Sequence, residues 1–162
     1  MAMKKIQNRS AQQTKEGADR IEIRTFGRFT VLKNGFPVHF SRNPSKKILA
    51  FLVDHRGQTV TKQIIASEVF NEDRYDEKVK NRMHTYLVRL KKDLELEGLG
   101  HILYVRNNDY GVITGNFYCD CYDLLEGNKE GVKDNPSNYM EDYEWADARR
   151  AFIEYKYYGR HE

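Results

Sequence analysis

Residues 75–95 read YDEKVKNRMHTYLVRLKKDLE, a stretch that combines an apolar repeat with charges of one sign. Between Lys78 and Lys92 it holds six Lys or Arg residues and no Asp or Glu. An α-helix turns about 100° per residue, so it would gather the apolar side chains on one side. These side chains are Val79, Met83, Leu87, Leu90 and Leu94. We therefore predict a helix over about residues 75–97, ended by Gly98, whose apolar stripe packs into a core.

The opposite side of this helix would carry hydrogen-bonding and cationic side chains, which suits the major groove of DNA. Arg, Asn and His can address base edges, the methyls of Thr and Val can meet the thymine methyl, and flanking cations neutralise phosphates. The residues predicted to contact bases are Asn81, His84, Thr85, Val88 and Arg89. Those predicted to contact phosphates are Lys80, Arg82, Lys91, Lys92 and, outside this helix, Arg106.

A basic amphipathic helix also suits an anionic membrane or calmodulin. Membrane binding would need bulky apolar groups on the free side, whereas here such groups belong to the stripe that faces the core. No apolar run approaches the roughly 20 residues of a membrane span. The N-terminus lacks the apolar core of a secretory signal. We therefore expect no membrane partner and a cytoplasmic protein.

Composition and charge limit the classes of protein to which this chain can belong. The 162 residues are 40% hydrophobic and 31% charged, which is typical of a soluble globular domain with an appendage. Residues 21–116 carry sixteen basic and eleven acidic side chains, whereas residues 117–162 carry six and eleven. This asymmetry indicates a polyanionic partner. Cys119 and Cys121 are expected to be reduced thiols of an intracellular protein, because cysteines in C-x-C spacing rarely bridge each other.

Local patterns predict a small sheet at the start of the folded region. Residues 1–20 lack apolar periodicity and are expected to be a flexible linker or overhang. Apolar residues alternate with period two from Ile21 onward, which is typical of strands. The pair Asn34–Gly35 favours a tight turn because both residues tolerate positive φ. We therefore predict an antiparallel sheet of about three strands.

Two helices are predicted between this sheet and the basic helix. The first takes Asn43 as N-cap and Pro44 as first helical residue, and it ends at Gly57. The second begins after the cap Thr61. The residues expected on their buried sides are Ile48, Leu49, Leu52, Val53, Ile64, Ile65 and Val69. After the basic helix, HILYVRNNDYGVITG (residues 101–115) predicts a β-hairpin with its turn at NND.

This order predicts an α+β fold with a winged helix-turn-helix: an N-terminal antiparallel sheet, three helices and a C-terminal β-hairpin wing over about residues 102–114. We assign residues 21–116 to the DNA-binding domain and residues 117–162 to a short helical extension. In the extension, a short helix starts at Asp120 and an amphipathic helix covers residues 139–158. Its apolar positions include Tyr143, Ala146, Phe152 and Tyr155.

The arrangement resembles the effector domain of OmpR/PhoB-type bacterial response regulators. LVRLKKDLE (residues 87–95) is similar to the family's recognition-helix ending, and YVRNNDYGV (residues 104–112) to its wing. The resemblance implies a transcription regulator of a two-component system that binds specific double-stranded DNA, as a homodimer on repeated half-sites. Residues 21–53 and 139–154 are also similar to activators that carry a bacterial transcriptional activation domain (SARP-like), in which a helical domain follows the winged helix.

The resemblance also implies roles for individual residues. His84, Val88 and Arg89 match positions that face bases, and Arg106 matches the wing arginine. The loop of residues 71–77 matches a segment that contacts RNA polymerase in the family, and the alternative is a solvated acidic loop. The candidate contacts in it are Glu72, Asp73 and Arg74. The family often has a basic residue at the position of Val88 and Gly where this chain has Asn107 and Asp109.

Nothing in the sequence indicates an enzyme. The five histidines are scattered, and no catalytic or phosphate-binding motif occurs. We expect no metal, no cofactor and no catalytic residue. The alternative to DNA binding is a winged-helix protein-interaction module whose basic helix binds an acidic partner. RNA binding is disfavoured because the sequence shows no paired aromatics on the exposed side of a strand.

Overall fold

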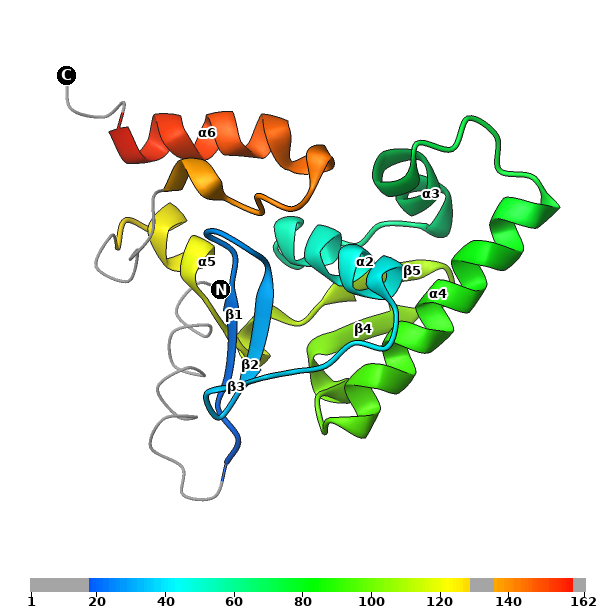
Figure 1. Cartoon of the computed structure of the whole chain (residues 1–162), viewed down its shortest axis with the longest axis horizontal. Coiled ribbons are helices and arrows are strands. Elements are labelled where there is room, and N and C mark those ends of the chain that lie inside the picture. The colour runs from blue at the N-terminus through cyan, green and yellow to red at the C-terminus, as the bar shows by residue number, and fades with distance from the viewer. Residues whose placement is uncertain (1–17, 129–135, 159–162) are drawn as a thin grey trace. The chain divides into compact units, whose positions relative to one another are not determined.

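The computed structural model describes residues 18–128 and 136–158, and its helices and strands are labelled in Figure 1. The chain divides into two compact units. Unit 1 joins the described residues up to Val38 with those from Phe117 onward, and unit 2 comprises residues 39–116. The linker expected over residues 1–20 falls mostly on residues 1–17, which lie outside the described residues. Unit 1 is therefore built from two stretches that are far apart in the sequence.

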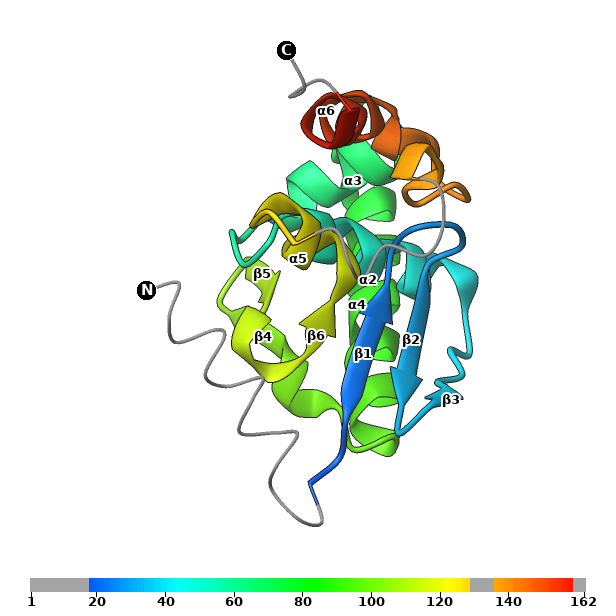
Figure 2. The ribbon, with the colours of Figure 1, turned by 90° about the vertical axis from the view of Figure 1, so that its left-hand side faces the viewer.

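A four-stranded sheet forms the framework of unit 1 (Figure 2). In spatial order its strands are β3 (Phe36–Pro37), β2 (Thr30–Lys33), β1 (Ile21–Arg24) and β6 (Tyr118–Cys119). β1 and β2 are antiparallel with Ile23 opposite Val31, and β6 is parallel to β1 with Cys119 opposite Ile23. Asn34 and Gly35 have φ of 53° and 88°, which confirms the predicted hairpin. The three predicted strands are present, but the sequence analysis missed β6.

The second half of unit 1 is helical, with one correction to the prediction. Its elements are α5 (Asp120–Leu125), the 3-10 turns η3 (Pro136–Asn138) and η4 (Glu144–Ala146), and α6 (Asp147–Tyr158). α5 begins at Asp120, as predicted. The helix expected over residues 139–158 begins only at Asp147, because Met140 adopts φ 48° and Tyr143 has an extended backbone (φ −125°, ψ 126°).

The Arg150 side chain holds the non-helical segment in front of α6 in place. Its guanidinium donates to the carbonyl oxygens of Tyr139, Met140 and Tyr143, each at 2.7 Å. The apolar positions expected in α6 were also partly wrong. Ile153 is fully buried, whereas Phe152 and Tyr155 are 41% and 65% exposed. Ala146, also predicted as an apolar position, is buried just before α6 begins.

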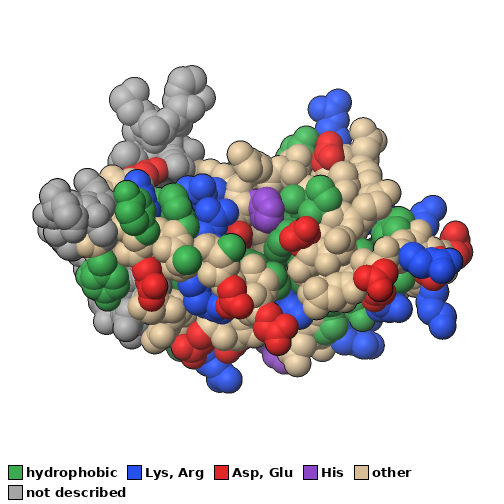
Figure 3. All heavy atoms as spheres, turned by 90° about the horizontal axis from the view of Figure 1, so that it is seen from above, with side chains coloured by type: hydrophobic (Ala, Val, Ile, Leu, Met, Phe, Trp, Pro, Cys, Tyr) green, Lys and Arg blue, Asp and Glu red, His purple; other side chains and the backbone are tan. Residues whose placement is uncertain are grey.

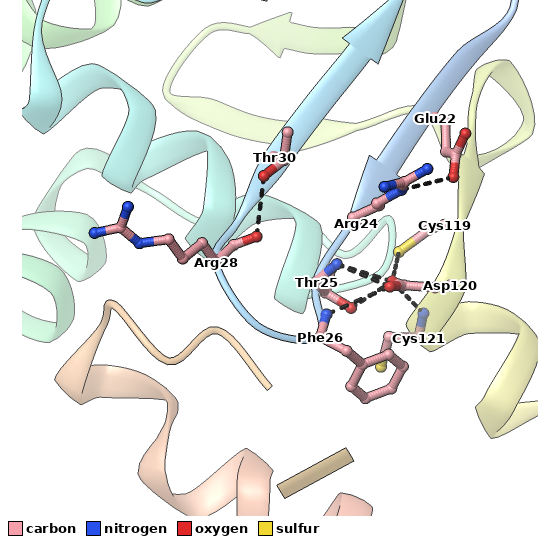
Figure 4. Close-up of polar contacts among 9 residues, drawn as sticks. All are labelled: Glu22, Arg24, Thr25, Phe26, Arg28, Thr30, Cys119, Asp120 and Cys121. Atoms are coloured by element: carbon pink, nitrogen blue, oxygen red, sulfur yellow. Dashed lines mark hydrogen bonds and ion pairs between the residues drawn. The ribbon is translucent and has the colours of Figure 1, made fainter. Parts of the chain in front are cut away.

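A buried carboxylate joins the end of β1 to the start of α5 (Figure 4). Asp120 accepts hydrogen bonds from the Thr25 backbone N (2.9 Å), the Thr25 hydroxyl (2.6 Å), the Phe26 N (3.3 Å) and the Cys121 N (2.8 Å). Burial raises the pKa of Asp120, and these hydrogen bonds oppose that rise. Burial also raises the pKa of the Cys119 thiol. Within the described residues, no disulfide joins Cys119 to Cys121.

Unit 2 contains three helices followed by a β-hairpin. In chain order the elements are α2 (Asn43–Asp54), α3 (Lys62–Phe70), α4 (Glu77–Leu96), the 3-10 turn η1 (Gly100–Ile102), β4 (Leu103–Arg106), β5 (Asp109–Val112) and the 3-10 turn η2 (Thr114–Asn116). β4 and β5 pair antiparallel, with Val105 opposite Tyr110. The predicted order of three helices and a hairpin is therefore present, with helix ends displaced by a few residues.

The starts of α2 and α3 differ in how they are capped. Thr61 caps α3, since its hydroxyl accepts a hydrogen bond from the Ile64 N at 3.2 Å. Asn43 was predicted as the N-cap of α2, but it is the first helical residue. Arg42 occupies the cap position with an extended backbone and no side-chain cap bond. Pro44 fits the first turn in either register, because its missing N–H has no partner there.

The buried sides of these helices form the core of unit 2. The fully buried α2 and α3 residues that were predicted are Ile48, Leu49, Leu52, Val53 and Ile65, and Val69 is 3% exposed. Ile64 was predicted to be buried but is 43% exposed. Its neighbour Ile65 occupies the inward position of this short helix instead. The buried residues of α3 are Ile65, Ala66 and Val69, which span about 100° of the helix, and Ile64 lies about 100° outside that sector.

Candidate nucleic-acid interface

The longest helix, α4, has one buried side and one exposed side. Asp76 starts it, since its side chain accepts a hydrogen bond from the Val79 N at 3.0 Å. The predicted apolar stripe is confirmed: Val79, Met83, Leu87, Leu90 and Leu94 are each at most 5% exposed. These anchors fix the rotation of α4 about its axis. The remaining side chains consequently project from a packed base.

The side chains predicted to contact bases lie on the exposed side of α4. Asn81, His84 and Thr85 are exposed, Val88 is 51% exposed, and Arg89 is half-buried. The Thr85 hydroxyl donates to the backbone carbonyl of Asn81 at 3.0 Å. Its proton is therefore used within the helix, and Thr85 offers the exposed side a methyl group and an oxygen that can only accept.

The side chains predicted to contact phosphates are less uniform. Lys80, Lys92 and Arg106 are exposed. Lys91 is exposed too, with its Nζ 3.9 Å from an Oε of Glu95 one turn along the helix. Arg82 is half-buried, and its guanidinium donates to the Glu72 carboxylate. Among the cations predicted to contact phosphates, Arg82 is thus paired with an acidic residue that precedes α4.

The loop between α3 and α4 holds the predicted polymerase-contacting residues. Asn71 ends α3 with φ 55°, and the Glu72 N donates to the Ala66 carbonyl at 3.0 Å. Glu72 is half-buried by its contact with Arg82, while Asp73 and Arg74 are exposed. The structure thus separates Glu72 from the other two candidates, because its carboxylate is directed to α4.

The hairpin is attached to the first turn of α3. The backbone N–H groups of Val60 and Tyr110 donate to each other's carbonyls at 2.9 Å. In the hairpin turn, the Asn108 side chain donates to Gln63 Oε1 at 2.9 Å, and its oxygen lies 3.4 Å from the Lys62 N. These contacts hold the strand end that carries Arg106. The contact of Asn108 with α3 was not predicted from the sequence. Its available signal was the pair of consecutive asparagines, Asn107 and Asn108, in the turn.

A second contact that the sequence analysis missed holds α4 to the segment before α2. Asp93 is 6% exposed and accepts hydrogen bonds from the Ser41 backbone N (2.9 Å) and hydroxyl (3.0 Å). The buried Ser45 hydroxyl donates to the Tyr86 carbonyl at 2.8 Å. Asp93 follows Leu90 by three positions and so lies beside the apolar stripe, which was the available signal. Both contacts restrain α4 from one flank.

The surface around α4 is rich in charge. Lys and Arg side chains gather at the right-hand end of the view in Figure 3, where α4 begins in Figure 1, with acidic side chains among them. Within residues 18–128 and 136–158, no group of three or more His, Cys, Asp or Glu could hold a metal ion. No helix in the same residues is long and apolar enough to cross a membrane. The middle of the exposed side of α4 thus offers hydrogen-bonding groups, cations and the apolar side chain of Val88.

Comparison with known proteins places the fold. No family model matches the sequence, and no curated protein matches it. The structure is similar to a solved structure of Mycobacterium tuberculosis EmbR in complex with a low-affinity phosphopeptide, with a TM-score of 0.60 and 19% sequence identity. The two chains share a fold. The match covers 86% of this chain and 43% of the EmbR chain, so this chain spans less than half of EmbR. The expected mixed α+β class is confirmed.

Proposed function

We propose that this chain is the DNA-binding part of a bacterial transcriptional regulator. Residues 39–116 act as a winged helix-turn-helix, with α4 in the major groove and the β4–β5 hairpin as a wing beside the minor groove. The observation that carries the proposal is the exposed side of α4. It combines base-reading side chains with cations over a buried stripe, and between Lys78 and Lys92 it contains no acidic residue. Such a side suits a groove that is walled by phosphates.

The geometry of α4 supports this proposal in two further ways. A helix of 20 residues is long enough to lie in the groove along several base pairs while its ends reach the backbone. Its rotation is fixed by the buried stripe and by the Asp93–Ser41 contact, so the backbone that carries the side chains predicted to face bases is held in one orientation. Lys80, Lys92 and Arg106 are exposed cations available to phosphates.

The first test is binding of the chain to duplexes selected from a random pool, followed by anisotropy titration at several salt concentrations. We expect affinity to fall steeply with salt, because bound phosphates release counterions. Arg89→Ala should weaken the selected duplex about tenfold or more and relax preference at one base pair. Lys92→Ala should weaken all duplexes alike and reduce the salt slope by about one. Equal binding of every duplex by Arg89→Ala and the parent would contradict the role of α4.

We further propose binding partners and a cellular compartment for this chain. Two protomers would occupy repeated half-sites, and the exposed Asp73 and Arg74 would contact RNA polymerase. The regulator would be of the OmpR/PhoB or transcriptional-activation-domain type, would act in the bacterial cytoplasm and would catalyse no reaction. The alternative is an acidic protein ligand for α4; EmbR itself was solved with a phosphopeptide. Binding of an acidic peptide in an assay that retains no duplex at low salt would favour this alternative.

A further inference from the structure

The exposed side of α4 contains an apolar spot that packing does not explain. Val88 is 51% exposed in the middle of α4, whose buried apolar residues all belong to the stripe. Thr85 lies three positions earlier, so its side chain neighbours Val88 on the helix surface. While the Thr85 hydroxyl donates to the Asn81 carbonyl, it does not donate to a base. Thr85 and Val88 together expose methyl groups on a part of the helix surface whose other side chains are polar or charged.

The chemistry of the major groove gives this spot a specific counterpart. Of the four bases, thymine alone presents a methyl group there, and the other base-edge groups are hydrogen-bond donors and acceptors. We propose that Thr85 and Val88 select thymine by contact with its C5-methyl group. This inference rests on the proposed function and deepens it by naming the feature of the DNA that is read.

The residues around the spot favour DNA over an apolar partner. His84 and Lys92, each four positions from Val88, are exposed, and Arg89 is half-exposed beside it. An apolar protein surface would leave these polar and charged groups without partners. In the major groove, base acceptors and phosphates would satisfy them while the methyl of one base covers Val88. The apolar spot is thus formed by Thr85 and Val88 and lies among polar and charged side chains.

The test replaces single thymines of the selected duplex by deoxyuridine, which lacks only the methyl group. For the parent chain we expect about a fourfold loss of affinity at one or two thymines and none at the others, as burial of one methyl group predicts. Val88→Ala should bind the thymine duplex more weakly and lose this sensitivity. The substitution should not disturb the fold, because Ala is a better helix former than Val at an exposed position.

A matched control comes from the end of the same helix. Leu96 is 76% exposed at the last residue of α4, about two turns beyond Val88, so Leu96→Ala removes apolar surface away from the predicted base contacts. It should keep the full deoxyuridine sensitivity. Val88→Thr, which exchanges one methyl for a hydroxyl at nearly the same volume, should lie between the parent and Val88→Ala.

Three outcomes would overturn the inference: no deoxyuridine position affects the parent, Val88→Ala retains the same sensitive position, or the selected duplexes contain no invariant thymine. In each case the chain still binds DNA, so the proposed function stands. A chain that binds no duplex at low salt would overturn the proposed function itself. Failure of the inference and failure of the function are therefore distinguishable.

Discussion

The pairing of Glu72 with Arg82 predicts that the loop before α4 limits DNA affinity. Arg82 is one of the cations expected to face phosphates, yet its guanidinium donates to the Glu72 carboxylate. The two side chains are 36% and 26% exposed, so solvent screens the pair and its contribution to folding is small. Replacing Glu72 by Gln removes the charge while preserving the shape. We expect Arg82 to become available to DNA at little cost in stability.

The size of the effect follows from counterion release. One additional phosphate contact makes the slope of log affinity against log salt steeper by about 0.9, and near 0.15 M salt it raises affinity about fivefold. Loss of an acidic group also favours DNA through the general field of the protein, without any specific contact. Glu68→Gln is the matched control, because Glu68 is an exposed acid of α3 and the substitution changes the net charge equally.

The assay is anisotropy titration of a labelled duplex at four or more salt concentrations. Glu72→Gln should show the steeper slope, whereas Glu68→Gln should raise affinity slightly with the parent's slope. In the double variant Glu72→Gln/Arg82→Gln, the slope should return to that of Arg82→Gln. If Glu72→Gln and Glu68→Gln have the same slope, Glu72 does not withhold Arg82 from the phosphates, and the reasoning fails.

Two further predictions concern stability. Asp120→Asn places an amide donor against the Thr25 and Phe26 donors, so the free energy of unfolding in urea should fall by about 2–3 kcal/mol. The pKa of Asp120 is raised in the folded state, so the free energy of unfolding of the parent should decline as pH rises from the ordinary Asp pKa to the raised pKa. Asp120→Asn should lack this decline. A variant with the same pH profile as the parent would contradict the prediction. Met83 is fully buried, so Met83→Ala should lower the free energy of unfolding, measured in urea, by about 2–5 kcal/mol. A decrease below about 1 kcal/mol would mean that the surrounding side chains move in to fill the cavity.

The sequence predicted the elements whose signals are local. The Asn34–Gly35 turn, the Thr61 cap and the buried stripe of α4 each depend on residues within a few positions of one another. Exposure of Asn81 and Thr85 followed directly from the stripe, since the opposite side of a packed helix must face outward. The contacts of these residues with DNA remain predictions.

What the sequence could not predict depends on partners far along the chain. β6 has two residues, too few for a period-two pattern, and it exists because it pairs with β1. Ser41 and Asp93 are 52 positions apart, and nothing near either of them indicates the other. The ion pair of Arg82 was missed for a similar reason, because the helix wheel places the side chain without its neighbours from the preceding loop.

The pairing of β1 with β6 has a consequence for how the chain is made. Thr25 and Asp120 are 95 positions apart, and all of unit 2 lies between them. During synthesis from the N-terminus, residues 39–116 leave the ribosome before Asp120 does, so α4 and its hairpin can fold while β1 still lacks its parallel neighbour β6. Closing that long loop late is slow relative to local helix formation. A pause in translation before β6 leaves the ribosome would therefore let α4 fold while the sheet of unit 1 is still incomplete.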